Sequence, residues 1–199
     1  MKTLKSIALA AVIMLTAGAF AQTVVFEENF QTFKEEGFRN GSDTLPCPKK
    51  KVHSKANFKV TKMYDGTKIT YSFMKAGVAP TCDSKKSPSN VSTGLVRVRK
   101  DGGEFTINNI PEVGSIIVEA SATGDVRGYA LMKSVDGGAW TKVGEYIGAK
   151  SEGQDAQYGF VNTIAINEKN VSLKFVPCMG GKDEQELREF CIHAVKVMK

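Results

Sequence analysis

The sequence predicts an all-β protein, a two-sheet antiparallel β-sandwich of jelly-roll type that is stapled by disulfides. Three observations lead to this fold class. Short segments alternate apolar with polar residues, which is the pattern of half-buried strands. Clusters of Gly, Pro, Ser, Asn and Asp separate these segments at intervals of roughly 8–12 residues, a spacing typical of sandwiches. The chain also carries four cysteines, an even number that favours two disulfides in an exported protein.

The expected strands follow one another along the chain, with one short helix expected at residues 183–188. Each strand is rich in the β-branched and aromatic residues that pack well on a pleated surface. Asp136-Gly137-Gly138 separates two of them and predicts a tight hairpin, because glycine adopts the positive φ of such turns at no steric cost. The strands are expected at residues 23–26, 57–63, 67–74, 94–99, 104–107, 115–122, 128–135, 139–146, 163–166, 172–176 and 190–198.

The first 21 residues, 1–21, predict a cleaved secretory signal. Lys2 and Lys5 form a positive start, residues 7–15 are an apolar run, and Ala-Phe-Ala at 19–21 supplies the small-x-small cleavage pattern. The run is too short to span a bilayer, and no cysteine follows it to carry a lipid anchor. We therefore expect an exported chain, in the periplasm or at the cell surface, whose residues 22–199 form a single β-sandwich domain.

The sequence surroundings of the cysteines suggest how they pair. Cys47 and Cys82 lie in similar segments rich in Pro, Ser and Lys, whereas Cys178 and Cys191 flank one loop between two expected strands. These positions predict the disulfides Cys47–Cys82 and Cys178–Cys191, although four cysteines allow three connectivities. A zinc site is the alternative, but no two cysteines have the C-x-x-C spacing of zinc ligands.

The order of the expected strands resembles a known group of proteins. It runs from TVVFEENF through STGLVRVRKDGGEFTI, GSIIVEASATG and GYALMKSVDGGAWTKVGEY to the closing FCIHAVKVMK. This succession is similar to that of the secreted bacterial jelly-roll modules, galactose-binding-like in fold, that accompany polysaccharide-degrading enzymes such as pectate lyases. The resemblance implies a domain that binds carbohydrate or serves as a structural companion. It also implies a structural Ca²⁺ near the first strand, with Glu27 or Glu28 as an oxygen ligand.

One strand face is the expected ligand surface. In the strand at 94–99, Arg97 and Arg99 alternate with two valines, so we expect the valines in the core and the arginines outside. Glu119, on a following strand, could pair with either arginine, and a solvated ion-pair face is the alternative to a sugar groove. Trp140, the one tryptophan of the chain, is either a stacking platform or a hairpin anchor. The expected ligand contacts are Arg97, Arg99, Glu119, Tyr129 and Trp140.

Two lysine-rich loops form an expected basic patch. If Cys47–Cys82 forms, it brings the loops together, and they would attract acidic glycans with an affinity that falls as salt rises. Solvated loops are the alternative. No aromatic residue interleaves these lysines, so we expect no nucleic-acid partner. The patch comprises Lys49, Lys50, Lys51, Lys55, Lys85 and Lys86.

The sequence favours binding over catalysis. His53 and His193 are the two histidines, and neither accompanies a G-x-S-x-G nucleophile motif. Glu27 and Glu28 are adjacent, so they point to opposite faces of a strand and do not form the carboxylate pair of a glycosidase. We expect a non-catalytic carbohydrate-binding module that requires no cofactor and inserts into no membrane. The alternatives are a structural or adhesion protein with an envelope protein partner, and a polysaccharide lyase.

Overall fold

The computed structural model of the chain describes residues 23–30, 38–40, 43–45, 57–79, 95–100, 102–122, 127–148, 159–179 and 189–199. The expected signal at 1–21, the basic patch, Cys47, Cys82 and the expected helix at 183–188 lie outside these residues. Within the described ranges, no helix reaches the length and hydropathy that crossing a membrane requires.

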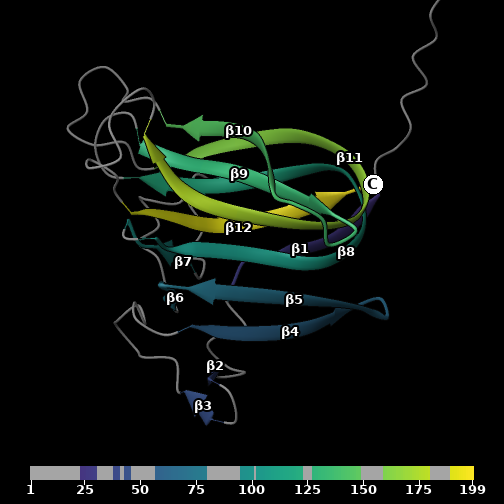
Figure 1. Ribbon diagram of the computed structural model, residues 1–199, viewed down its shortest axis with the longest axis horizontal. Helices are drawn as coiled ribbons and strands as arrows, with labels where there is room; N and C mark the ends of the chain where they lie inside the picture. The colour runs from purple at the N-terminus through teal and green to yellow at the C-terminus, as the bar shows by residue number, and fades with distance from the viewer. Residues whose placement is uncertain are drawn as a thin grey trace, which may run out of the picture.

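The described residues are organised as strands that run side by side (Figure 1). Neighbouring strands are antiparallel at each of their pairings. The bounds are β1 Val24–Glu28, β2 Phe38–Asn40, β3 Asp43–Leu45, β4 Phe58–Tyr64, β5 Thr67–Met74, β6 Ala76–Ala79, β7 Leu95–Val98, β8 Glu104–Ala122, β9 Arg127–Val135, β10 Thr141–Ile147, β11 Phe160–Met179 and β12 Phe190–Met198.

Two long strands, β8 and β11, connect the two layers of the sandwich. They pair with each other from Phe160 opposite Ala120 to Phe175 opposite Phe105. The first layer contains the N-terminal half of β8 and the C-terminal half of β11, together with β10, β9, β5, β4, β2 and β3. The second layer contains the other halves of β8 and β11, together with β12, β7, β6 and β1.

Three asparagines mark the bend of these long strands. Asn109, Asn167 and Asn170 have φ values of 67°, 53° and 51°, a left-handed conformation that asparagine tolerates better than most residues. The β8–β11 register shifts beside Asn167 on β11 and beside Asn109 on β8, as it does at β-bulges. The sequence predicts a chain break at each of these places. The structure instead has a continuous ladder that bends from one layer into the other.

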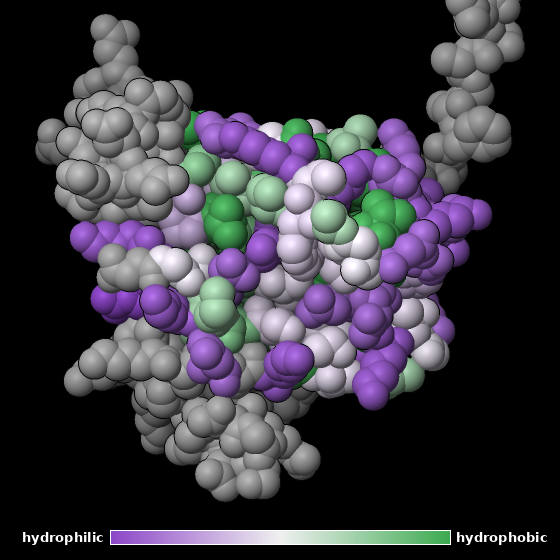
Figure 2. All heavy atoms as spheres, viewed as in Figure 1, coloured by the Kyte–Doolittle hydropathy of each residue, from purple (hydrophilic) through white to green (hydrophobic). Residues whose placement is uncertain are grey.

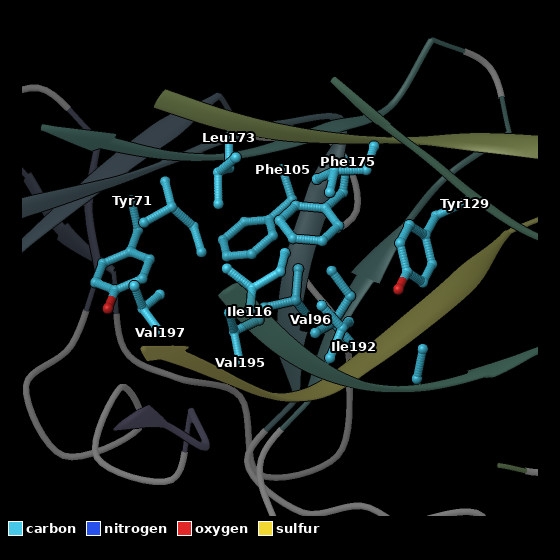
Figure 3. Packing of buried hydrophobic residues seen from close by; sticks show 14 of the residues in the cluster. Tyr71, Val96, Phe105, Ile116, Tyr129, Leu173, Phe175, Ile192, Val195 and Val197 are labelled. Atoms are coloured by element: carbon cyan, nitrogen blue, oxygen red, sulfur yellow. The ribbon is translucent and has the colours of Figure 1, made fainter. Parts of the chain in front are cut away.

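Aromatic side chains fill the core between the layers. The Phe105 ring is fully buried, and its centroid lies 5.1 Å from that of Phe73, 5.6 Å from Phe175 and 5.7 Å from Phe30. Figure 3 shows Phe105 and Phe175 in the middle of the core, between Tyr71 at one end and Tyr129 at the other. Such rings supply much of the apolar area that a sandwich buries.

The all-β antiparallel sandwich is therefore confirmed, and its jelly-roll type stays a prediction. The hairpin at residues 136–138 forms as expected, with φ values of 50° at Asp136 and 71° at Gly137. Strands β2, β3 and β6 were not expected from the sequence. Each is only three or four residues long, too short for alternation to reveal.

The expected Cys178–Cys191 disulfide does not form in the structure. Cys178 pairs with Gly128 in the first layer, whereas Cys191 pairs with Ser121 in the second. The two cysteines are close in sequence, but they belong to strands of different layers. Burial raises the pKa of the Cys178 thiol to about 11, which makes it a poor nucleophile at neutral pH.

Replacing Phe105 with alanine should strongly destabilise the fold, because the cavity would lie where four ring contacts meet. We expect the free energy of unfolding in urea to fall by about 3–5 kcal/mol. Val161→Ala is the control, since Val161 is 52% exposed and should change stability by less than about 0.5 kcal/mol. Equal losses in the two variants would contradict the central role of Phe105.

Candidate functional site

Arg97 lies on the outer face of β7, as the alternation predicts. Val96 and Val98 are fully buried, so the side chain between them points away from the core. Arg97 Nη2 forms an ion pair with Glu189 Oε1, which lies just before β12. Arg99 follows the end of β7 and is half-buried.

Glu119 lies on the same layer, but it is not a cross-strand neighbour of Arg97. It pairs with Ala194 of β12 on one side and with Val161 of β11 on the other. Strand β12 also pairs with β7, so it lies between the glutamate and the arginine. The order of strands therefore separates the two residues, and Arg97 uses Glu189 as its partner.

Tyr129 belongs to the core and not to a ligand surface. Its side chain is fully buried, with ring centroids 5.4 Å from Phe175 and 5.6 Å from Phe190. Its hydroxyl donates a hydrogen bond to Asn162 Oδ1 at 3.1 Å. Burial, and then the neighbouring Tyr146, raise the pKa of Tyr129 well above its ordinary value. Tyr129 was expected to contact a ligand, but its buried side chain is out of reach of any ligand on an outer face.

Trp140 lies at the surface, in the connection between β9 and β10, and is 38% exposed. Lys174 Nζ of β11 lies 4.6 Å from the centroid of the indole ring, a cation–π contact. The same ammonium is 3.5 Å from Glu104 Oε1 of β8. These contacts fix the indole plane while part of its surface stays open to solvent.

The hairpin that carries the tryptophan is held by hydrogen bonds at three points. Ser134 Oγ donates to Gly138 O at 2.6 Å, and Gly138 N donates to Val135 O at 2.8 Å. Asn170 Nδ2 of β11 donates to Asp136 Oδ1 at 2.9 Å. These hydrogen bonds fix the hairpin that presents Trp140 at the surface.

Polar side chains continue from the tryptophan across the outer face of the first layer. Lys174 pairs with Thr106, and Thr106 pairs with Ser72, so the three side chains share this face. Asn108 Nδ2 donates to Ser72 Oγ at 3.0 Å. We call this surface the Trp140 face, and it consists of Trp140, Lys174, Glu104, Thr106, Ser72 and Asn108.

Glu28 is the centre of a buried polar network where β1 approaches β4. It is 4% exposed, and its Oε1 accepts the Phe30 N–H at 2.7 Å. Its Oε2 accepts the Tyr64 hydroxyl at 2.6 Å and lies 2.9 Å from Lys62 Nζ. Because the Tyr64 proton goes to the carboxylate, the Tyr71 hydroxyl must donate to Tyr64, 2.8 Å away. Burial, and the charge and hydrogen bond of Tyr64, raise the pKa of Tyr71 well above its ordinary value.

The expected calcium ligands point in different directions. Glu27 is exposed and lies 3.3 Å from Lys196 Nζ, whereas Glu28 faces the inside and contacts the Lys62 ammonium. In the described part of the chain, no group of three or more His, Cys, Asp or Glu is arranged to hold a metal ion. Lys62 was not among the expected site residues. It lies two residues after buried Val60, so the two share the inner face of β4, and this spacing is the signal that could have found it.

His193 is fully buried beside Ser121, with His193 Nε2 2.7 Å from Ser121 Oγ. His193 Nδ1 is buried and has no hydrogen-bond partner. Burial lowers the pKa of His193 to about 4, so the ring is neutral at physiological pH. The closed surroundings fit a structural role better than a Ser–His catalytic pair, which a substrate must reach.

Replacing Tyr64 with phenylalanine should destabilise the fold, because Glu28 then loses a donor and Tyr71 loses its acceptor. We expect a loss of about 1–3 kcal/mol in the free energy of unfolding in urea. Tyr146→Phe is the matched control, since Tyr146 is only partly buried and keeps its ring contact with Tyr129. An unchanged stability of Tyr64→Phe would show that the network does not hold β1 to β4.

His193 should make stability fall as the pH drops from about 6.5 to about 4. In this window the unfolded chain binds a proton at His193 and the folded chain does not, so acid favours unfolding by up to about 3 kcal/mol. Urea unfolding at several pH values should show a smaller slope for His193→Gln. The same slope in both proteins, or an NMR titration of the His193 ring near pH 6.5, would refute this.

No protein-family model matches the chain, and no curated protein is similar to it in sequence. In structure the chain is similar to a carbohydrate binding module, CBM6cm-2 of Cellvibrio mixtus lichenase 5A, in complex with cellotriose. The two chains are 12% identical in sequence, and their TM-score is 0.34. The match covers 89% of this chain and 98% of the module. The chain is similar to the K2 cleaved adhesin domain of Lys-gingipain, with 9% identity, a TM-score of 0.44, and coverage of 74% and 92%.

It is also similar to an exo-β-1,3-galactanase of Phanerochaete chrysosporium with galactose, at 15% identity, a TM-score of 0.35, and coverage of 71% of this chain. This chain spans only 29% of the length of the galactanase. None of the three similarities assigns a ligand or an activity to this chain.

Proposed function

We propose that the chain is a non-catalytic binding domain for carbohydrate, exported as residues 22–199 to the periplasm or the cell surface. The observation that supports this most is the Trp140 face, where a pre-positioned indole stands beside a row of hydroxyl, amide and charged groups. In Figure 2 hydrophilic residues are spread across the visible face, and hydrophobic ones form small separate patches. This suits a polar ligand better than an apolar one.

The chemistry of the Trp140 face matches that of a sugar. Pyranose rings present C–H groups that pack on an aromatic surface, and the exposed part of Trp140 offers one. Their hydroxyl groups both donate and accept hydrogen bonds, and the half-buried Ser72 hydroxyl and Asn108 side-chain carbonyl are groups of the face that could take part. Lys174 and Glu104 neutralise each other, so the face attracts a neutral glycan without requiring a charged one.

The remaining expected contacts are assigned secondary roles in this proposal. Arg97, Arg99 and Glu119 lie away from the Trp140 face, β12 separates Glu119 from Arg97, and Arg97 is already engaged by Glu189. The basic patch would add salt-sensitive attraction to acidic glycans. A structural Ca²⁺ at Glu27 or Glu28 is the less favoured expectation, because each carboxylate already faces a lysine ammonium, and a calcium titration is its test.

The lyase alternative is weaker because its expected groups are not together. A lyase site needs an arginine and a tyrosine in one cleft, but Arg97 points outward from the second layer while Tyr129 lies in the core. Binding to an envelope protein is the other alternative, and the glycan experiment below separates it from the proposal.

The proposal predicts that mature protein from Gln22 binds neutral glycans on an array, with a signal that persists when the salt concentration is raised. Trp140→Ala should weaken the affinity for the best glycan at least tenfold, or about 1.4 kcal/mol, in calorimetry. Val161→Ala, an exposed position on the second layer, is the control and should bind as the wild type does.

Other outcomes would replace this proposal. Binding restricted to acidic glycans and abolished by salt would move the site to the basic patch. No glycan binding at all would reject the carbohydrate function and favour an envelope protein partner. Formation of unsaturated sugar product, seen as an absorbance increase with pectin-type polymers, would identify a lyase.

A further inference from the structure

We propose that the chain has a second ligand site, a pocket between β1 and β4 that takes one neutral sugar unit. The pocket has a volume of about 670 Å³ and opens to solvent. Its volume lies in the range of small-molecule sites. The pocket shares none of its described lining residues with the Trp140 face. Its lining consists of Glu27, Glu28, Asn29, Thr61, Lys62, Met63 and Tyr64.

The pocket lies at an open edge of the sandwich, where the two layers are joined by side chains. Strand β1 belongs to the second layer through β12, and β4 belongs to the first through β5. The Glu28 network spans this gap, because Tyr64 and Lys62 of β4 both contact the carboxylate of Glu28 on β1. The inner wall of the pocket is therefore polar and rigid before a ligand binds.

The fixed groups of the inner wall favour a hydroxyl-bearing ligand. Glu28 is 4% exposed and Lys62 is 11% exposed, so the charges of this pair are largely shielded from water. A carboxylate has about four acceptor positions, and three contacts to Glu28 are in place, from Phe30 N, Tyr64 Oη and Lys62 Nζ. One acceptor position on Glu28 is left for a ligand hydroxyl, which is the kind of donor that a sugar presents.

The rim of the pocket completes a surface suited to a sugar ring. Asn29 and Thr61 are exposed and supply an amide and a hydroxyl, which together donate and accept hydrogen bonds. Met63 is 63% exposed on the outer face of β4, and Tyr64, the next residue, is half-buried on the inner face. These two offer apolar contact for ring C–H groups. The rim thus offers both polar and apolar groups to a sugar ring.

The charges exclude two other ligand classes. Among the described lining residues, Glu28 pairs with Lys62, and Glu27 pairs with Lys196 at 3.3 Å, so these residues present no positive excess for an acidic sugar. A divalent cation at Glu28 would have to displace the Lys62 ammonium, which lies 2.9 Å from Glu28 Oε2. The neutral sugar is therefore the class that the pocket fits.

The test is NMR titration of the mature chain with a panel of neutral methyl hexosides and methyl pentosides, each to about 10 mM. We expect at least one glycoside to shift the signals of Asn29 and Thr61 in a saturable way. Methyl glucuronide should bind more weakly than that glycoside, and CaCl₂ alone should leave both signals in place.

Two threonines provide a matched pair of variants. Thr61 Oγ1 and Thr70 Oγ1 are 3.2 Å apart and share one hydrogen bond, so Thr61→Val and Thr70→Val remove the same contact. Thr61 lines the pocket, and Thr70 is not among the lining residues. Thr61→Val should weaken the glycoside about fivefold, the effect of one lost hydrogen bond, whereas Thr70→Val should have little effect.

Other results would overturn the pocket. The pocket is rejected if no glycoside shifts any signal, or if saturable shifts are confined to the signals of Trp140 and Lys174. It is also rejected if Thr61→Val and Thr70→Val weaken the glycoside affinity equally. Tighter binding of methyl glucuronide, or a saturable shift of the Asn29 signal with Ca²⁺, would identify another ligand class. Trp140→Ala separates the two proposals, because it should weaken glycan binding at the Trp140 face at least tenfold and leave the pocket titration unchanged. A failed array with a positive pocket titration would reject the first proposal alone.

Discussion

The continuous pairing of β8 with β11 is the constraint on which the rest of the structure depends. The ladder joins Phe160 to Ala120 at one end and Phe175 to Phe105 at the other, and it belongs to both layers. Because its two ends lie in different layers, β9 and β5 extend one layer while β12 extends the other. The buried rings of Phe105 and Phe175 stack 5.6 Å apart on the ladder itself, which couples its register to the formation of the core.

The sequence predicted the faces of the strands better than their connections. Alternation placed Val96 and Val98 in the core correctly, because a period of two is a local property. It divided β8 and β11 into shorter strands, because Asn167 and Asn170 resemble loop residues whether they end a strand or bend it. Strand order is a long-range property, so the place of β12 between Glu119 and Arg97 could not be predicted from either segment.

The candidate site was predictable to the same extent. Trp140 was identified as the one tryptophan, but its partner Lys174 lies on a strand that only the fold brings near. Tyr129 was expected at the surface, because a tyrosine in an alternating strand suits either face and its burial depends on the opposite layer. Glu28 was singled out as an oxygen ligand. Its cationic partner proved to be Lys62, because β1 meets β4 in the fold.

The Glu28 network costs desolvation free energy that an apolar edge would avoid. Buried ion pairs are often no more stabilising than apolar side chains of similar volume, so stability alone does not account for four polar groups here. Strands β1 and β4 have no ladder in common, and their described pairings are to β12, β5 and β2. Hydrogen bonds through Glu28 and Tyr64 therefore set the distance between the layers at this edge. Apolar side chains in their place would let β1 and β4 approach each other more closely. A sandwich edge built in this way leaves a polar, solvent-accessible opening between the two layers. A ligand pocket at this edge requires such an opening.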